Sequence, residues 1–571
     1  MLISKQSFDI IIIGSGGAGL MAAISAIESG RKNIAVISKV VPSSSHTVAA
    51  KGGINASLSN VETDDWKWHA YDTLKGSDYL ADNDAVELLC REAQMAILDL
   101  EKMGVVFSRK DDGKISQRAY GGQTTNFGKG GVAYRACYSK DETGHTILHT
   151  LYEQAVKKGV KFFSEFFVTD LLIEAQNHCH GCLALDLSSG ELVIFSAQTT
   201  ILATGGYSQI YQNTTSSLIC TGDGSALVFK EGLPLQDMEF VQFHPTGIEG
   251  RGFLITEAAR GEGGYLVNSS GQRFMQNYAP KMLELASRDI ISQAMATEIH
   301  KGEKIYLDLR HLDEEVLNNK LPGVIELVKN FVRLDVKKDL IPVSPSAHYT
   351  MGGIPTDLDC VVIEGLMAVG ETACASVHGA NRLGCNSLLD LIVFGKIAGK
   401  KAAEKIVQKN AVIAEKIAAE KIEKLKKLFG SSEVESLAFL KKELQENNEK
   451  HLGVFRDKKL LESGLERLRE LYEIFKNYKI KNKNLMWNEE LVEYFELENL
   501  LLNSLATNFS ALNRRESRGA HYRSDFCDRD DKNFHAHSLV KMRDDLEFSL
   551  KTVRNFSEIP ELNLELQKRS Y

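Results

Sequence analysis

A glycine-rich turn between an apolar segment and an alanine-rich segment is the strongest constraint on the fold. Residues 8–13 predict a strand, a helix is expected to end at Ser29, and residues 34–37 predict a second strand. Between the first strand and the helix stands Gly14-Ser15-Gly16-Gly17-Ala18-Gly19, a GxGxxG pattern in the context of a dinucleotide-binding unit. Such glycines allow a tight turn and let backbone N–H groups approach a pyrophosphate. We therefore expect a Rossmann-like α/β domain.

The end of the second strand distinguishes between dinucleotides. An NAD site usually has an acidic residue there for the ribose hydroxyls, whereas this chain has Ser38-Lys39. FAD, held by hydroxyl and lysine contacts and by distant segments, is therefore favoured over NAD. Two later apolar strands, at 199–204 and 365–371, end in Gly-Gly and Gly-Glu and are candidates for those segments. The FAD-binding domain is then expected to be discontinuous, because both strands return to the flavin.

The domain organisation follows from these segments and from a change in composition. We predict an FAD-binding domain at 1–234 and 351–405, with an α+β capping domain inserted at 235–350. Helical periodicity predicts a helical domain at 406–510, interrupted at Gly430, Gly453 and Gly464. The remainder, 511–571, is predicted to be a small, irregular C-terminal domain, and its charged segment 515–523 suggests an interface.

Composition excludes several classes of partner. The hydrophobic content of 43% and charged content of 25% are typical of a soluble globular protein, and a net charge of −8 gives no case for nucleic acid. The uncharged run 10–27 is interrupted by glycines and follows Asp9, so we predict no direct membrane span. Membrane association would come through partner subunits.

The nine cysteines are scattered and predict no metal site. Cys179 and Cys182 form the one CxxC, and without a second ligand pair they are interpreted as part of a polar hairpin between strands 166–174 and 182–187. The spacing also argues against an iron–sulfur cluster in this chain, and it indicates a reducing compartment.

Six further segments carry candidate chemistry, and together they resemble one family. A histidine, His46, follows three serines shortly after the first dinucleotide unit. The others are segments 239–247, 254–264, 285–289, 348–353 and 378–389, which are rich in His, Arg, Glu and Gly. In this order they resemble the flavoprotein subunit of succinate dehydrogenase or fumarate reductase, over nearly the whole chain.

The resemblance implies a role for each matching position. It implies that FAD is covalent, bonded at its 8α carbon to His46, with further cofactor contacts at Gly14, Ser15, Gly16, Gly17, Ala18, Gly19, Ser38, Lys39, Thr47, Gly52, Gly53, Asp223, Glu371, Ser387 and Leu388. It implies that the dicarboxylate is bound by His244, Thr256, His348 and Arg382, and that Arg288 transfers the substrate proton through a relay of Glu257 and Arg260. Lys51 departs from the family, which usually has Gln there. Two interpretations are open: a cation that faces the flavin and raises its potential, or a side chain that points to solvent.

Elementary chemistry agrees with most of these roles. An arginine binds a carboxylate with two hydrogen bonds, as Arg382 would, and histidines donate to carboxylate oxygens. Glu257 and Arg260 are three residues apart and would share one face of a helix. Residue chemistry alone favours His244 or His348 over Arg288 as the acid–base group, because a free arginine does not readily release its proton.

The resemblance predicts an enzyme, a subunit of a succinate:quinone oxidoreductase that interconverts succinate and fumarate. The predicted partners are an iron–sulfur subunit and a membrane anchor subunit, which would hold the chain at the cytoplasmic side of the inner membrane; export stays open. The alternatives are L-aspartate oxidase, which binds FAD non-covalently, a soluble fumarate reductase, and a non-enzymatic flavin-binding scaffold. The direction of the reaction is not predicted.

Overall fold

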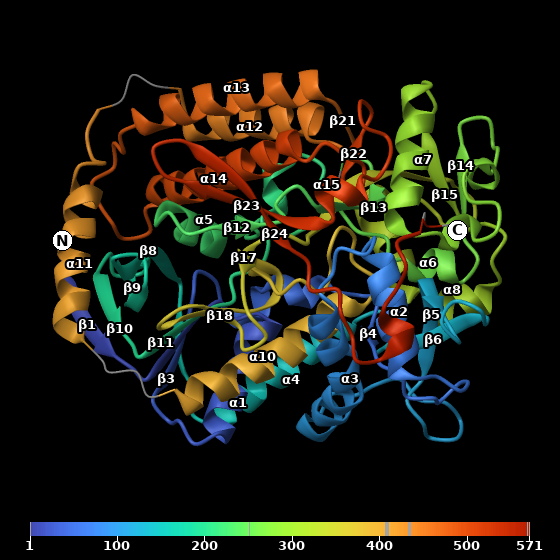
Figure 1. Cartoon of the computed structure of the whole chain (residues 1–571), viewed down its shortest axis with the longest axis horizontal. Coiled ribbons are helices and arrows are strands. Elements are labelled where there is room, and N and C mark those ends of the chain that lie inside the picture. The colour runs from blue at the N-terminus through green and yellow to red at the C-terminus, as the bar shows by residue number, and fades with distance from the viewer. Residues whose placement is uncertain (1, 251, 406–409, 432–434, 568, 570–571) are drawn as a thin grey trace.

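A six-stranded sheet organises the first part of the fold in the computed structural model, which describes residues 2–250, 252–405, 410–431, 435–567 and 569 (Figure 1). The strand order is β18-β19-β11-β2-β3-β7, with every neighbouring pair parallel except β18 and β19. The strands are β2 (Ile10–Ile13), β3 (Ile34–Ser38), β7 (Lys161–Ser164), β11 (Thr199–Leu202), β18 (Val361–Ile363) and β19 (Leu366–Ala368). The segments predicted to return to the first unit, at 199–204 and 365–371, therefore supply the strands β11 and β19 of the same sheet.

Two helices on this sheet pack at unusually short range. Helix α1 (Gly17–Glu28) lies against α10 (Asn386–Glu404). A Cβ on Gly399 would lie 2.2 Å from the carbonyl oxygen of Ala22, so glycine is what allows the two backbones to approach. Gly395, one turn earlier, makes the same kind of approach to Ala18. α1, which follows the glycine-rich turn, is thereby fixed to α10, which begins four residues after Arg382.

A second sheet packs beside the first and corrects one prediction. Its order is β1-β10-β9-β8, with bounds β1 (Ile3–Ser7), β8 (Phe166–Glu174), β9 (His178–Asp186) and β10 (Leu192–Ser196). The predicted hairpin exists, but Cys179 and Cys182 lie within β9, not in the turn. β9 begins at His178, four residues before the predicted start at Cys182, so the polar residues 178–181 belong to the strand and not to the turn. Both thiols are therefore buried.

The part of the chain from β13 to β16, inserted between β11 and β18 of the six-stranded sheet, forms a unit with its own apolar core, at the right of Figure 1. Its sheet has the order β13-β16-β15-β14, with β13 (Val241–Ile248), β14 (Tyr265–Asn268), β15 (Ile305–Asp308) and β16 (Ile341–Thr350). Its helices are α6 (Ala258–Gly261), α7 (Arg288–His300), α8 (Glu314–Lys320) and α9 (Pro322–Leu327). The exact domain boundaries given above stay a prediction.

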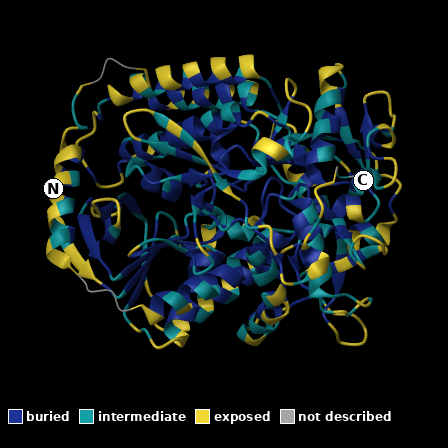
Figure 2. Cartoon of the chain, viewed as in Figure 1, coloured by how far each residue is buried: buried dark blue, intermediate teal, exposed yellow. Residues whose placement is uncertain are grey.

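Four helices, α11 to α14, follow the flavin sheet, with α12 and α13 as outer layers in Figure 1. They are α11 (Ala411–Lys426), α12 (Leu437–His451), α13 (Lys458–Lys476) and α14 (Glu489–Asn513). Figure 2 shows exposed residues along the outside of α13 and buried residues beneath. Gly464 does not interrupt a helix as predicted; it lies inside α13, where a Cβ would come within 2.7 Å of His451. No described helix combines the length and apolar character needed to cross a membrane.

The last part of the chain is more regular than the sequence suggests. Strands β23 (Ala536–Met542) and β24 (Leu546–Thr552) form a hairpin that pairs with β12 (Leu235–Gln236). The remaining elements are α2 (Trp66–Gly76), α3 (Asn83–Met103), α4 (Thr143–Lys157), α5 (Asp223–Lys230), α15 (Asp531–Phe534), β4 (Ile54–Asn55), β5 (Gln117–Thr124), β6 (Val132–Cys137), β17 (Ile354–Pro355), β20 (Ala373–Cys374), β21 (Phe455–Arg456) and β22 (Tyr522–Arg523).

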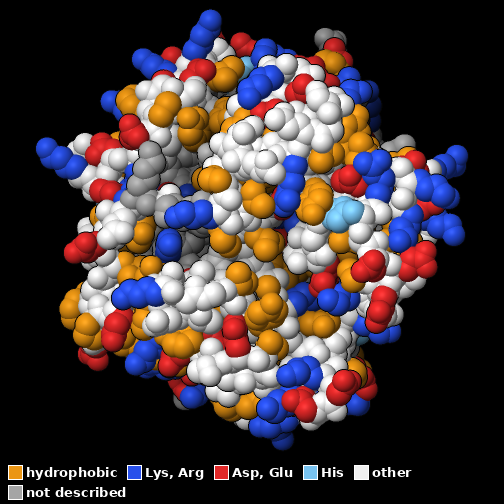
Figure 3. Space-filling model, turned by 90° about the vertical axis from the view of Figure 1, so that its right-hand side faces the viewer, with side chains coloured by type: hydrophobic (Ala, Val, Ile, Leu, Met, Phe, Trp, Pro, Cys, Tyr) orange, Lys and Arg blue, Asp and Glu red, His pale blue; other side chains and the backbone are white. Residues whose placement is uncertain are grey.

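The charged segment 515–523 is mainly internal, so its interpretation as an interface was wrong. Arg518 and Glu516 are buried and pair at 2.8 Å, and Glu516 also accepts from Arg514 at 2.9 Å. The density of opposite charges allows these side chains to satisfy one another away from water. On the outer face that Figure 3 shows, basic and acidic side chains are interspersed instead of forming a patch of one sign.

Candidate active site

One cavity of about 320 Å³ joins most of the predicted site residues. It runs from the start of α1 past His46 to Arg288 and Arg382. Two predicted residues, Gly19 and Arg260, do not line it, although Arg260 lies directly behind Glu257. The others that line it are Gly14, Ser15, Gly16, Gly17, Ala18, Ser38, Lys39, Thr47, Gly52, Gly53, Asp223, His244, Thr256, Glu257, His348, Glu371, Ser387 and Leu388.

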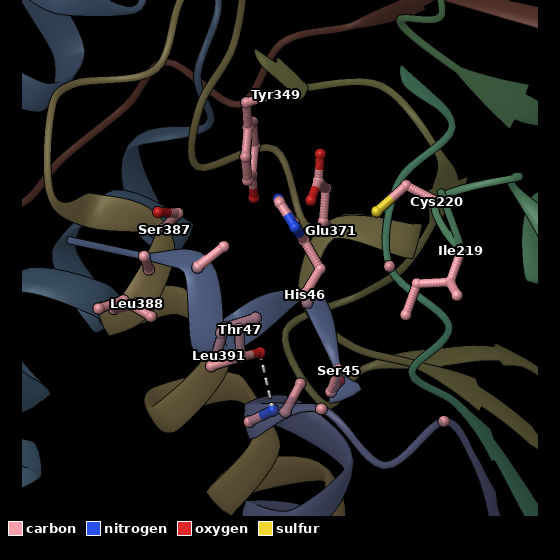
Figure 4. Close-up of a pocket in the computed structure, with 18 of the residues that line it drawn as sticks. Ser45, His46, Thr47, Ile219, Cys220, Tyr349, Glu371, Ser387, Leu388 and Leu391 are labelled. Carbon is pink, nitrogen blue, oxygen red and sulfur yellow. Dashed lines mark hydrogen bonds between the residues drawn. The ribbon is translucent and has the colours of Figure 1, made fainter. Parts of the chain in front are cut away.

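The glycine-rich turn makes one end of this cavity. Gly14 has a φ of +112°, and a Cβ there would lie 2.1 Å from the carbonyl oxygen of Ala203. Only glycine allows this approach of the turn to β11. The hydroxyl of Thr47 accepts from the backbone N–H of Gly17 at 3.1 Å, which fixes the His46 segment to the first residue of α1 (Figure 4).

Lys39 follows β3 at the position where an acidic residue usually stands, and it brings in a carboxylate from a distant segment. Its ammonium group is buried and lies 3.0 Å from Asp223 and 2.7 Å from Glu496 of α14. Burial would lower the pKa of Lys39, but these two carboxylates raise it above its ordinary value. Asp223, which also accepts from Thr221 and Asn499, thus places a carboxylate at this end of the cavity from a distant segment.

His46 lies in the middle of the cavity. Figure 4 places its ring between Tyr349 and Glu371. Burial lowers the pKa of His46 to about 4, so the imidazole is neutral at physiological pH. Its Nδ1 accepts from the backbone N–H of Ser217 at 3.3 Å. Burial also raises the pKa of Glu371 to about 7, even though its carboxylate accepts from the Thr350 amide at 3.0 Å.

A buried amide joins the two arginines at the other end of the cavity. Oε1 of Gln242 accepts from Nη1 of Arg288 at 2.8 Å and from Nη2 of Arg382 at 3.1 Å. Arg382 also donates to Ser387 and lies over the Tyr349 ring, but it makes no ion pair with a carboxylate in the described part of the chain. Burial and the neighbouring Arg288 lower the pKa of Arg382 to about 10, so it is still a cation at neutral pH.

Glu257 lies between two arginines, as the relay requires. Its Oε2 atom is 2.9 Å from Nε of Arg288 and 3.6 Å from Nη2 of Arg260, and its Oε1 accepts from the Gly121 amide at 3.0 Å. Burial would raise the pKa of Glu257, but the two guanidinium groups hold it below its ordinary value. The carboxylate is therefore ionised and links Arg288 to Arg260.

The two histidines are neutral neighbours of this cluster. The rings of His244 and His348 are 4.9 Å apart, and Nδ1 of His348 is 2.8 Å from the Thr215 hydroxyl. Burial first, and then the Arg288 charge, hold the pKa of both histidines well below the ordinary value. Neutral imidazoles can donate an N–H hydrogen bond to a carboxylate, but they lack the acidic second proton of an imidazolium.

Sequence reasoning missed Gln242 and Tyr349. Gln242 is two residues before His244 on β13, so the alternation of a strand places both on one face, which is a signal in the sequence. Tyr349 directly follows His348, and its contacts with Arg382 and the His46 cavity depend on how β16 meets the turn at 378–385. No local pattern could have indicated that packing.

Comparisons with known proteins define the class first. A family profile described as an FAD binding domain matches residues 9–388, and one described as the C-terminal region of fumarate reductase flavoprotein matches 441–571. The fold and cavity are therefore those of an FAD-dependent oxidoreductase. The succinate dehydrogenase flavoprotein subunit of Rickettsia bellii is 50% identical over 557 residues, covering 94% of this chain and 93% of that protein. The fumarate reductase flavoprotein subunit of a Serratia species is 40% identical over 559 residues, covering 93% and 92%.

Solved structures give the same result. FrdA of E. coli quinol fumarate reductase has a TM-score of 0.93 at 38% identity, with 98% of each chain covered. Sdh1 of Mycobacterium smegmatis in complex with UQ1 has a TM-score of 0.84 at 32% identity, covering 96% of this chain and 95% of that one. The chain belongs to the family of succinate dehydrogenase and fumarate reductase flavoprotein subunits. The predictions of family, fold class, enzyme class and FAD are confirmed, and the comparisons do not favour the alternatives.

The residues present fit FAD, which in this family is typically attached to a histidine. The backbone of Gly14 to Gly17 lines the cavity, so that a pyrophosphate could come close to it, as the sequence predicts. The local geometry of His46 also suits the attachment. Alkylation at Nε2 would leave Nδ1 as an acceptor only, and the Ser217 N–H donates to that nitrogen.

Proposed function

We propose that the chain binds a four-carbon dicarboxylate at Arg382 and interconverts succinate and fumarate. The observation that carries this proposal is the buried guanidinium of Arg382, whose Nε has no hydrogen-bond partner in the described structure. A buried cation without a carboxylate is costly, so the site favours an anionic ligand. His244, His348 and Thr256 line the same cavity and would donate to the carboxylate oxygens.

Arg288 is the proposed proton donor and acceptor at the substrate carbon. His244 and His348 are poor candidates because their low pKa values make both imidazoles weak proton acceptors and leave neither of them as an imidazolium that could donate. Arg288 is the cation at the Arg382 end of the cavity that contacts an ionised carboxylate, Glu257; Lys39 and its carboxylates lie at the other end. The proton would then pass along Glu257 to Arg260, behind the cavity. FAD, when bound, supplies the redox step by accepting a hydride from succinate or giving one to fumarate.

His46 is the proposed point of covalent attachment, since it lines the cavity and its imidazole is neutral and nucleophilic. We further propose that the chain works with an iron–sulfur subunit and a membrane anchor, which would place it at the cytoplasmic side of the inner membrane. Solved relatives are complexes with UQ1 and with menaquinol.

The test is made on the complex purified with its partner subunits. Flavin should remain with the acid-precipitated protein, and malonate should inhibit succinate oxidation competitively. Flavin that is released by acid, together with activity toward L-aspartate, would support L-aspartate oxidase instead. A complex that binds flavin but neither malonate nor succinate would contradict an enzymatic role.

A further inference from the structure

Arg569 bridges two separate parts of the chain through buried ion pairs. Its Nη2 atom lies 2.5 Å from Asp289 and 3.2 Å from Asp78, and its side chain is 8% exposed. Asp289 directly follows Arg288 in the first turn of α7, whereas Asp78 lies just after α2. One guanidinium group thus ties the inserted unit to the flavin-binding part.

The segment that leads to Arg569 is held in place by packing. Leu562 is buried against Ala70 and Leu74 of α2, and its carbonyl oxygen accepts from the Asn83 side chain at 3.1 Å. Figure 1 shows this final segment running along α2 toward α7. Leu562 therefore anchors the segment seven residues before Arg569, whereas residues 563 and 565–567 are exposed, so the ion pairs of Arg569 itself complete its placement.

Two hydrogen bonds lead from Asp289 to the arginines of the site. Oδ1 of Asp289 accepts from Nδ2 of Asn381 at 3.1 Å, and Oδ1 of Asn381 accepts from Nε2 of Gln242 at 2.8 Å. Oε1 of Gln242 is the acceptor that Arg288 and Arg382 share. Nε2 of Gln242 also donates to the backbone oxygen of Arg382 at 2.8 Å, so Asn381 and that carbonyl hold the amide together, and Asp289 in turn holds Asn381.

Electrostatics make Arg569 necessary for this orientation. The Asp289 side chain is 1% exposed, and a carboxylate so buried is costly without a cation beside it. A displaced Asp289 would release Asn381 and leave the NH₂ group of Gln242 with the Arg382 carbonyl as its one remaining acceptor, so that the amide could rotate more easily. Rotation would turn the NH₂ group of Gln242 toward two guanidinium groups, which only donate.

We propose that Arg569 is a positioning residue: through Asp289 and Asn381 it orients the Gln242 amide and so sets the relative position of Arg288 and Arg382. It touches neither the cavity nor the substrate. The inference rests on the proposed roles of Arg288 and Arg382, and it adds a residue outside the cavity to the machinery that aligns a dicarboxylate.

The experiment compares Arg569→Met and Arg569→Lys with wild type in the assembled complex. Arg569→Met should lower kcat/KM for succinate by about 10- to 100-fold, because displacements of about an ångström at reacting groups have effects of this size. The Kd of malonate should rise in parallel, while the amount of covalent flavin stays unchanged. Arg569→Lys should recover part of the loss, because an ammonium group can pair with Asp289 but does not reproduce the two-sided contact.

Arg529→Met is the matched control. Arg529 donates to the same Asp78 at 2.8 Å, pairs with Asp531 and donates to the Gln567 carbonyl at 3.0 Å, but it makes no contact with Asp289 among the described residues. It therefore tests a loosening of the segment before Arg569 without removal of the Asp289 ion pair. Its loss should lower the melting temperature while leaving the malonate Kd near the wild-type value. In a double-mutant cycle, adding Asp289→Asn to Arg569→Met should cause little further loss.

Three results would overturn the inference. Arg569→Met could keep the wild-type malonate Kd, it could match Arg529→Met in every measurement, or its effect could add fully to that of Asp289→Asn. In each case wild type still binds malonate, so the proposed function stands. A wild-type complex that does not bind malonate would instead refute the proposed function and this inference with it.

Discussion

Arg288 and Arg382 donate to the same atom, Oε1 of Gln242, at 2.8 and 3.1 Å. Their charges are balanced differently. Arg288 is paired with Glu257, whereas Arg382 has no carboxylate partner among the residues described. One cation is thus supplied with its counter-ion by the protein, and the other is left for a ligand. The substrate-binding and proton-transferring roles proposed for these two arginines follow from that difference.

Arg382→Gln should weaken dicarboxylate binding more than any change at the surface. Loss of one member of a buried charge pair costs about 2 kcal/mol or more, so kcat/KM for succinate should fall about 30-fold or more. Titration with malonate measures the binding part directly. Arg310→Gln, at an exposed pair with Asp308, is the control and should leave both values unchanged. A wild-type malonate Kd in Arg382→Gln would contradict the proposed anion site.

Arg288→Ala should reduce kcat by about 100-fold or more, the usual size of a lost general acid–base group, and leave malonate binding measurable. Because Glu257 is held ionised by two arginines, the pH–rate profile should also change when Arg288 is removed. His244→Ala should instead raise KM with a smaller effect on kcat, since its imidazole is neutral. Substantial turnover of Arg288→Ala would move the proton role to a histidine.

His46→Ser should keep FAD bound but not covalently attached. The remaining contacts of the cavity, at the glycine-rich turn and around Lys39, still hold the dinucleotide. Without the covalent bond the flavin potential should fall, so succinate oxidation should decrease more than fumarate reduction. Potentiometric titration and assays in both directions measure this. An equal loss in the two directions, with an unchanged potential, would argue against the linkage at this residue.

His537 should make stability depend on pH above neutrality. Burial would lower the pKa of His537, but Asp237 at 2.6 Å and Asp82 at 3.2 Å raise it from 6.5 to about 9. The folded state therefore binds a proton that the unfolded state releases, and the stabilisation is complete below about pH 6.5 and lost as pH rises through about 9. The difference in melting temperature between wild type and His537→Gln should be largest at pH 6 and shrink toward pH 10. A constant difference would mean that His537 is not protonated.

Gly399→Ala should destabilise the protein by about 1 to 3 kcal/mol, the usual cost of overpacking. Helix propensity alone favours alanine by about 1 kcal/mol, but the new Cβ would lie 2.2 Å from the backbone oxygen of Ala22 and force α10 away from α1. Gly131→Ala is the control, because a Cβ there meets nothing within 4 Å. Denaturation of both variants measures the difference, and equal stabilities would show that α1 and α10 can separate freely.

Much of the site could be predicted because it lies in motifs whose chemistry is local. The glycine-rich turn predicts the start of α1, and the apolar strands that end in glycine predict β11 and β19 of the same sheet. His244 and His348 lie on β13 and β16, which are antiparallel neighbours, but their convergence depends on a register shift that leaves His348 without a paired residue on β13. What could not be predicted is which groups meet across these elements.

The charged segment 515–523 illustrates that limit. Its arginines have the same sequence pattern whether they face solvent, a partner or the interior. Arg518 is held inside by a contact with Asp78, and the adjoining Arg514 by one with Glu239, both hundreds of residues away in the chain. Likewise, Gln242 and Asn381 become important only because β13 and the turn before α10 lie side by side. Pairings of this kind depend on tertiary contacts that no local window contains.

The contact between α1 and α10 has a consequence for the timing of the reaction. The dinucleotide is gripped at the first residues of one helix, and Arg382 stands four residues before the other begins. Because Gly395 and Gly399 hold α10 close against α1, the distance between the dinucleotide site and Arg382 is set when the chain folds. We expect it to stay constant during the catalytic cycle. We therefore expect any opening that admits substrate to involve the inserted unit, which carries Arg288, so that closure would also bring the proposed proton donor to the substrate.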